Sequence, residues 1–352
     1  MTTTLTRPAV DFVLPEDRIA TGPIEAAGGR RDAGRLLVAR KSGGEVALHD
    51  AVFADLRRFL RAGDVLVINI SGTLPAAVPT TDGRLLHLST ELPGGLWVVE
   101  LRRPCGAGSQ PLLDGRPGER VPLPAGEAEL LTPFPADHQG RPRLWVARLR
   151  LPLLLLAYLH DHGHPIRYGC AAEAWPTAAY QTVFATVPGS AEMPSAARGF
   201  TAELVTSLVS AGVVFAPITL HTGVSSLESG EPPYPERYEV PASSAAVVNA
   251  ARSDGHRVIA VGTTATRALE TVADERGTVH PGAGWTELVI TPDRGVRAVD
   301  GIISGWHEPE ASHLHLLEAV GGRTVIERSY AHALATGYRW HEFGDFHLIL
   351  PD

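Results

Sequence analysis

The chain has 352 residues, of which 44% are apolar and 20% charged, so it can bury a core of ordinary size. Its formal net charge of −8 excludes a protein that holds nucleic acid by a uniformly basic surface, although a local basic patch stays compatible with it. Cys105 and Cys170 form no Cys-x-x-Cys pair, which favours a reducing compartment over a disulfide scaffold or a zinc site.

No signal peptide is visible in residues 1–11, which lack a basic region followed by an apolar run. The longest apolar stretch, residues 149–159, is interrupted by Arg150 and Pro152 and is too short to span a bilayer. We therefore expect a cytoplasmic protein with no membrane partner.

The first predicted elements belong to an α/β sheet. Residues 11–24 form an extended arm, and residues 35–40 form a buried strand. Residues 51–60 carry apolar side chains at helical spacing, and Ala62-Gly63 stops that helix. Residues 64–69 are almost uniformly apolar, as expected of a strand that is covered on both faces.

The pattern changes in residues 71–150. Short alternating runs, such as 96–101 and 143–149, are separated by Gly/Pro clusters, which is typical of a small antiparallel β-barrel. We expect this barrel to be inserted into an α/β catalytic domain made of residues 1–70 and 151–352.

Helices and strands alternate again after Pro165. The predicted helices are residues 201–211, 245–254, 265–273, 312–320 and 329–335, and the predicted strands are residues 213–220, 257–261 and 347–350. This alternation indicates βαβ units, so the predicted fold class is α/β with a mainly parallel sheet and flanking helices.

The clearest local signal is Gly262-Thr263-Thr264-Ala-Thr-Arg267, which follows an apolar strand and opens a helix. Ligands in open α/β sheets bind beyond the carboxyl ends of the strands, and N–H groups at a helix start can hold a carboxylate or a ribose hydroxyl. The alternative is that Thr264 only caps the helix.

Two histidines occupy comparable positions. His221 stands at the carboxyl end of a predicted strand, where it can act as an acid or base or be a satisfied structural histidine. His307 lies in a loop before a helix that carries His313 and His315. Since positions i and i+2 do not share a helix face, we expect no metal pair on that helix.

The tract His160-Asp-His162-Gly-His164 resembles a metal site, but no further Cys or His cluster at ligand spacing accompanies it. We interpret it as a helix C-terminus followed by a turn and expect no metal.

The C-terminal stretch, residues 337–345, combines aromatic, cationic and acidic side chains. Its aromatic rings can stack on a base, and Asp345, just after Gly344, is a candidate for recognising a ribose or an ammonium group. The alternative is a packed terminal strand with a turn before it.

Taken together, these motifs resemble the S-adenosylmethionine:tRNA ribosyltransferase-isomerase family of queuosine biosynthesis. The resemblance rests on an ordered set of segments over nearly the whole chain: Gly63-Asp64-Val65-Leu66-Val67 with Asn69 and Pro75-Ala76, Tyr180-Gln-Thr-Val-Phe-Ala185, Pro194, Phe200-Thr201, Thr219-Leu220-His221, Gly262-Thr-Thr-Ala-Thr-Arg267, His307-x-Pro309, Tyr338-Arg339, and Phe343-Gly344-Asp345 with Leu348-Ile349.

This resemblance implies an enzyme that transfers the ribosyl part of S-adenosylmethionine to the aminomethyl group of a deazaguanine in tRNA, giving epoxyqueuosine and releasing adenine and methionine. It implies S-adenosylmethionine as co-substrate, tRNA as partner, an α/β domain with an inserted small barrel, and we expect a monomer. The implied catalytic residues are His221, His307 and Asp345. The implied S-adenosylmethionine-binding residues are Gly262, Thr263, Thr264, Arg267, Tyr338 and Gly344.

The chain departs from the family pattern at several positions. Ile70-Ser71-Gly72 replaces an acidic, a hydroxyl and a basic residue, and the family's Ala-Pro-Thr-Ala-Gly-Leu-His-Phe run reads Met193-Pro-Ser-Ala-Ala-Arg198-Gly199-Phe200. Two alternatives therefore stay open: a related enzyme that uses S-adenosylmethionine with a free small-molecule acceptor such as a deazapurine, and a non-catalytic protein that binds a ligand or RNA.

Overall fold

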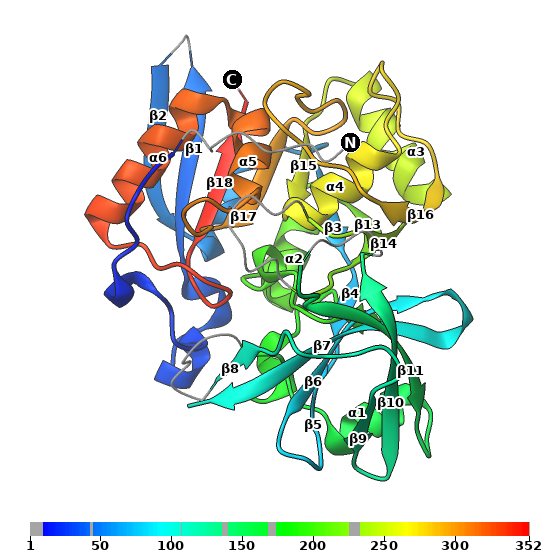
Figure 1. The fold of residues 1–352 in the computed structure, drawn as a ribbon. Coiled ribbons are helices and arrows are strands. Elements are labelled where there is room, and N and C mark those ends of the chain that lie inside the picture. Colours follow the sequence, from blue (N-terminus) through cyan, green and yellow to red (C-terminus); the bar gives the residue numbers. More distant parts are fainter. Residues whose placement is uncertain are drawn as a thin grey trace.

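The computed structural model describes residues 10–42, 45–106, 108–135, 140–167, 174–224 and 233–351. Cys170 lies outside these ranges. A nine-stranded sheet and a seven-stranded sheet form the two main parts of the molecule (Figure 1).

The nine-stranded sheet is mixed. Its strands, in spatial order, are β16 (Gly282–Thr286), β14 (Glu236–Val240), β13 (Val214–His221), β3 (Val65–Asn69), β15 (Val258–Val261), β17 (Gly301–Gly305), β18 (Phe346–Leu350), β1 (Arg35–Ser42) and β2 (Glu45–Val52). The central strands β13, β3, β15 and β17 are parallel to one another. β18 runs antiparallel to β17 and parallel to β1, and the edge strands β2, β14 and β16 are antiparallel.

The predicted α/β class with a second, antiparallel sheet is confirmed, whereas the prediction of a mainly parallel large sheet is not, because its described strand pairs are equally often antiparallel and parallel. β14 and β16 form an antiparallel edge from short segments that carry charged residues or glycines, and they do not read as buried parallel strands. The helix predicted for residues 51–60 is also wrong, because β2 extends to Val52 and a 3₁₀ helix, η4, covers Phe53–Phe59. Phe53 and Leu56 are buried three residues apart, a spacing that suits a 3₁₀ turn as well as an α-helix.

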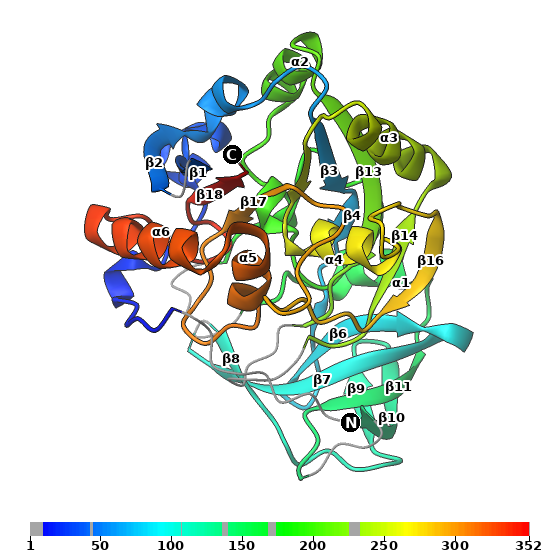
Figure 2. The same cartoon turned by 90° about the horizontal axis from the view of Figure 1, so that it is seen from above.

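Each helix predicted in the second half of the chain is present. These are α2 (Ala202–Ser210), α3 (Ala242–Ser253), α4 (Thr263–Thr271), α5 (His313–Gly321) and α6 (Arg323–Thr336). On β3, Leu66 and Ile68 pack with α2, whereas Val65 and Val67 pack with α3 and α4. Helices α5 and α6 cover β17, β18 and β1 (Figure 2). Because both faces of β3 are covered, its sequence is apolar throughout.

The seven-stranded sheet is antiparallel. Its strands are β5 (Ala77–Pro79), β6 (Leu85–Leu92), β7 (Leu96–Cys105), β8 (Gly108–Pro111), β9 (Arg120–Leu123), β10 (Gly126–Phe134) and β11 (Leu144–Arg150). Its strand order ends at β5 and β9, so over the described residues it is an open half-barrel. Helix α1 (Leu155–His162) packs on its core through Tyr158 and Leu159. The helix ends at His162, as the sequence predicts for the histidine tract.

A two-stranded parallel sheet joins the two parts. β4 (Ser71–Thr73) follows β3 and precedes β5, and it pairs with β12 (Val187–Ser190). The Gln181 side chain fixes β4 further, since its Nε2 donates to the Thr73 carbonyl at 2.7 Å and its Oε1 accepts from the Thr73 N–H at 3.0 Å.

Of the helices in the described ranges, none has the length and apolar character that crossing a bilayer requires.

Candidate active site

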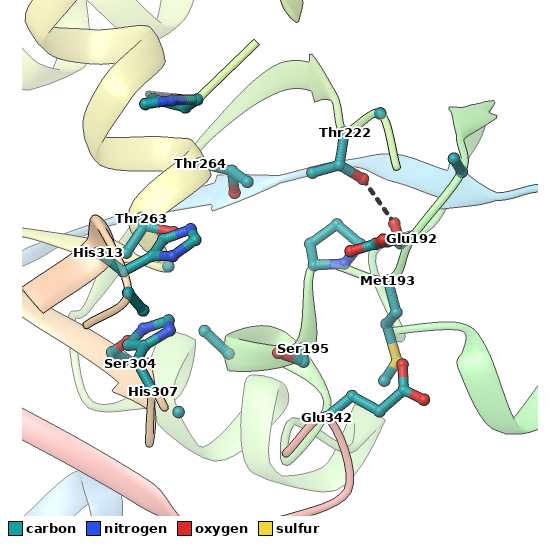
Figure 3. A pocket seen from close by; sticks show the side chains of 18 of the residues that line it. Glu192, Met193, Ser195, Thr222, Thr263, Thr264, Ser304, His307, His313 and Glu342 are labelled. Atoms are coloured by element: carbon teal, nitrogen blue, oxygen red, sulfur yellow. Dashed lines mark hydrogen bonds between the residues drawn. The ribbon is translucent and has the colours of Figure 1, made fainter. Parts of the chain in front are cut away.

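A cavity of about 430 Å³ lies beyond the carboxyl ends of β13, β15 and β17. One wall comes from the start of α4 and the loop between β17 and α5, and the opposite wall comes from the segment after β12 and the loop before β18 (Figure 3). This is the edge of an α/β sheet at which ligands bind, and the volume is within the range of small-molecule sites.

The start of α4 forms part of the first wall, as the sequence predicts. Gly262 has a φ of 97° and its N–H donates to the Ile303 carbonyl at 2.8 Å, so the chain turns sharply from β15 into α4. Thr263 and Thr264 line the cavity, and Thr264 Oγ1 accepts a 3.3 Å hydrogen bond from Asn69 Nδ2. The first N–H groups of a helix have no intrahelical partners, so this end of α4 offers donors to an anionic group.

Arg267 also lines the cavity, but its donors are engaged by protein groups. Its Nη1 is paired with the Glu236 carboxylate, Nε donates to the Leu288 carbonyl at 3.1 Å, and Nη2 lies 3.3 Å from the Thr286 carbonyl. Arg267 therefore holds Glu236 in place. Burial raises the pKa of Glu236, whereas the Arg267 charge lowers it.

His307 projects into the cavity from the loop after β17 and stacks on His313, with ring centroids 4.5 Å apart and planes within 5° (Figure 3). Its Nε2 lies 2.9 Å from Ser304 Oγ, and the Tyr330 hydroxyl lies 3.3 Å from its backbone N–H. Burial, and then the neighbouring His313 and His347, lower the pKa of His307 well below its usual value. His307 is therefore a neutral, fixed imidazole at the cavity.

The opposite wall carries carboxylates. Glu192 and Met193 follow β12, and Glu342 comes from the loop before β18 (Figure 3). The carbonyl of Glu192 accepts a 2.7 Å hydrogen bond from Thr222 Oγ1, which fixes this segment to the end of β13. Burial, and then the Glu192 charge, raise the pKa of Glu342 to about 8, against a lowering by Arg198.

His221 lies beside the cavity rather than in its lining. Its Nδ1 is 2.8 Å from Ser71 Oγ, which is 2.6 Å from Ser190 Oγ, so the histidine ties β13 to the β4–β12 pair. A Cβ at Gly189 would lie 2.4 Å from the His221 ring, so the contact needs glycine there. Burial, and then Arg237, lower the pKa of His221 to about 4. These contacts favour the structural alternative for His221.

The C-terminal candidates also lie outside the lining. Both Asp345 oxygens accept backbone hydrogen bonds of 2.8 Å, from the N–H groups of Arg35 and Arg339. Tyr338 is fully buried and its hydroxyl donates to Asp50 at 2.7 Å. A Cβ at Gly344 would lie 2.4 Å from the Arg339 carbonyl oxygen, so this turn requires glycine. The C-terminal motif builds the loop that presents Glu342 to the cavity.

Sequence reasoning missed several lining residues. Glu192, Glu236, His313 and Glu342 come from four separate segments, and their common position arises only from the sheet order. The departure of residues 193–200 from the family pattern was an available signal, since Met193 and Ser195 line the cavity.

No group of three His, Cys, Asp or Glu side chains within the described ranges is placed to hold a metal ion, and the absence of a metal stays a prediction.

Comparisons with known proteins agree with this architecture. Residues 8–349 match the family described as queuosine biosynthesis protein. The chain is 37% identical to an S-adenosylmethionine:tRNA ribosyltransferase-isomerase from Symbiobacterium thermophilum, over 97% of this chain and 98% of that protein. It is 36% identical to the protein of the same name from Thermus thermophilus, over 97% and 99%.

A crystal structure of S-adenosylmethionine tRNA ribosyltransferase from Thermotoga maritima has the same fold, with a TM-score of 0.54, 25% identity, and coverage of 97% of this chain and 100% of that chain. The family match and the relatives both extend over nearly the whole chain, and two of the family-like motifs, Gly262–Arg267 and the one that begins at His307, contribute to the cavity lining. The chain therefore belongs to the queuosine biosynthesis protein family.

Proposed function

We propose that this protein transfers the ribosyl moiety of S-adenosylmethionine to a 7-aminomethyl-7-deazaguanine in tRNA, giving epoxyqueuosine with release of adenine and methionine. The names of its relatives, at 37% and 36% identity over nearly their full length, support this assignment. S-adenosylmethionine is then a co-substrate that is consumed.

The observation that carries the proposal is the charge of the cavity. Five glutamates line it, and among its described lining residues Arg267 is the single arginine or lysine, already paired with Glu236. The glutamates are Glu192, Glu236, Glu308, Glu310 and Glu342. A sulfonium ion is a cation with no hydrogen-bond donor, so the charge of nearby carboxylates stabilises it without directed bonds. Glu308 and Glu310 stand on the wall of His307, where this proposal places the nucleotide.

The residues suggest distinct roles on the two walls. The N–H groups at the start of α4, with Gly262, Thr263 and Thr264, suit the methionine carboxylate or the ribose hydroxyls. The sulfonium acidifies the adjacent ribose carbon, and neutral His307 is placed to accept a proton there. Arg267 orients Glu236, while His221, Tyr338, Gly344 and Asp345 hold the surrounding loops.

The experiment is to measure adenine and methionine released from S-adenosylmethionine with modified tRNA, with the free deazaguanine base, and with neither. Release that requires the tRNA supports the proposal. Release with the free base supports the small-molecule enzyme instead, and no release with either acceptor supports a non-catalytic binder.

One observation favours the small-molecule alternative as a second candidate. Met193 and Ser195 face the cavity in the segment that departs from the family pattern, so the departures change the shape of the cavity itself.

We further propose that residues 1–70 and 151–352 form the catalytic domain, that residues 71–150 are inserted into it, and that the protein is a monomer.

A further inference from the structure

The carboxylate of Glu342 faces the cavity. It is half-buried, it lies on the wall opposite Thr263 and His307 (Figure 3), and the described residues offer it no hydrogen bond within contact distance. The loop that carries it is fixed by Asp345, whose two oxygens accept backbone N–H groups. A fixed loop that presents an unpaired carboxylate indicates that the partner of this group is a ligand.

The nearby arginine does not neutralise Glu342. Arg198 is 3% exposed, and its Nη2 donates to both Glu25 oxygens, at 3.0 and 2.8 Å. Its Nε lies 3.3 Å from the Ala179 carbonyl, and its guanidinium lies 4.9 Å from the centre of the Phe343 ring. Arg198 is thus held by other groups, while Glu192 adds a second negative charge on the same wall.

We infer that Glu342, with Glu192 beside it, selects an acceptor that carries a primary amine, binding it as an ammonium ion and taking its proton before the amine attacks the ribosyl group. In this step an N–H bond of the ammonium breaks, an O–H bond forms on the Glu342 carboxylate, and the electron pair stays on nitrogen. The lone pair is then free to form the new N–C bond to the ribosyl group, whose bonds to adenine and to the sulfonium sulfur break over the reaction and release adenine and methionine. The inference rests on the proposed function and names the group that chooses its acceptor.

The placement of the two walls supports this assignment over a role toward S-adenosylmethionine. The helix start and His307, which suit the nucleotide, stand on one wall, and the two carboxylates stand on the other. Burial and Glu192 raise the pKa of Glu342 to about 8, so this carboxyl can hold a proton near neutral pH, which an ordinary carboxylate cannot. A base with this affinity for protons matches the task of deprotonating an ammonium.

The test compares the wild type with Glu342→Gln and with the control Glu275→Gln, an identical chemical change in an exposed turn outside the lining. Calorimetry with S-adenosylmethionine present measures the affinity for 7-aminomethyl-7-deazaguanine and for its 7-hydroxymethyl analogue, each free and within a tRNA anticodon stem. We expect Glu342→Gln to weaken binding of the amine by about tenfold or more, and to leave the hydroxymethyl analogue and S-adenosylmethionine unchanged.

Four results would overturn the inference. Glu342→Gln could weaken both analogues equally, weaken neither, or weaken S-adenosylmethionine binding while acceptor binding is unchanged; or the wild type could fail to bind the amine. Because binding requires no turnover, it reports on Glu342 separately from the proposed function, which fails if the wild type releases no adenine. In an active enzyme, the fall of kcat toward low pH is expected to disappear in Glu342→Gln and to return in Glu342→Asp.

Discussion

Individual side chains divide into those that face the cavity and those that build its walls. His307 and Glu342 belong to the first group, because their functional atoms reach the cavity and their backbones are held by other residues. Asp345 belongs to the second, because its oxygens are already used by the backbone. The distinction predicts different outcomes for substitutions in the two groups.

His307→Ala is expected to reduce turnover by about 10²-fold or more, because it removes a positioned proton acceptor from the cavity. Its effect on the melting temperature is expected to be small, since the ring stacks mainly on His313 at the cavity surface. Turnover and thermal unfolding should be measured beside His280→Ala, a histidine that pairs with Asp274 at the surface. A large fall in melting temperature would instead give His307 a structural role.

Asp345→Asn is expected to lower the free energy of unfolding by about 1–3 kcal/mol. The amide group would place a donor against one of the N–H groups of Arg35 and Arg339, which the carboxylate now accepts at 2.8 Å. Chemical denaturation measures this loss. If the variant keeps its stability and loses turnover, the catalytic role predicted from the sequence is the correct one.

At the scale of elements, a buried arginine links α4 to the antiparallel edge of the large sheet, beside a 2.6 Å hydrogen bond between the hydroxyls of Thr271 and Thr286. Arg267 on α4 pairs with Glu236 at the start of β14 and donates to the Thr286 carbonyl at the end of β16. Both charged side chains are nearly enclosed, with exposed fractions of 8% for Arg267 and 13% for Glu236. This ion pair adds to the strand pairing of β13 with β14 and of β14 with β16 in holding the edge beside the cavity.

Arg267→Met is expected to cost about 3–5 kcal/mol, because it leaves Glu236 as an uncompensated buried charge. The double variant Arg267→Met with Glu236→Gln is expected to recover part of that loss, since the charge is then removed as well. Urea denaturation of both variants measures the two values. A double variant that is no more stable than the single one would show that the packing of Arg267, rather than its charge, matters.

The sequence predicts β1, β3, β13, β15 and the helices after residue 200 well, because residues such as Val65 to Ile68 face covered surfaces on both sides and are apolar throughout. It does not predict β17, whose Gly301 and Gly305 weaken any strand signal, or β14, in which three of the five residues are charged as in a loop. The sequence spacing also does not predict that Glu192 and Glu342 line one cavity, because they are 150 positions apart in the chain and only the fold brings them together.

The molecule as a whole has an acidic cavity at the carboxyl ends of its parallel strands, and the chain carries a net charge of −8. Such a field favours cationic ligands and weakens as salt is added. The cavity should therefore distinguish S-adenosylmethionine from S-adenosylhomocysteine, which has the same nucleoside but a neutral thioether.

We expect S-adenosylmethionine to bind about tenfold more tightly than S-adenosylhomocysteine at low ionic strength, and the difference to shrink in high salt. At about 100 times its dissociation constant, S-adenosylmethionine should raise the free energy of unfolding by about 2.7 kcal/mol. Thermal shift and calorimetry measure both effects. Equal affinities at every salt concentration would mean that the carboxylates do not sense the sulfonium.

The position of β18 has a consequence for folding of the protein. β18 contains residues 346–350, yet it lies between β17 and β1 in the sheet order. The hairpin of β1 and β2 therefore joins the rest of the sheet only through a strand that follows it by most of the described residues. Closure of the sheet is thus a late step of folding, and the edges of β1 and β17 stay unpaired until β18 joins both.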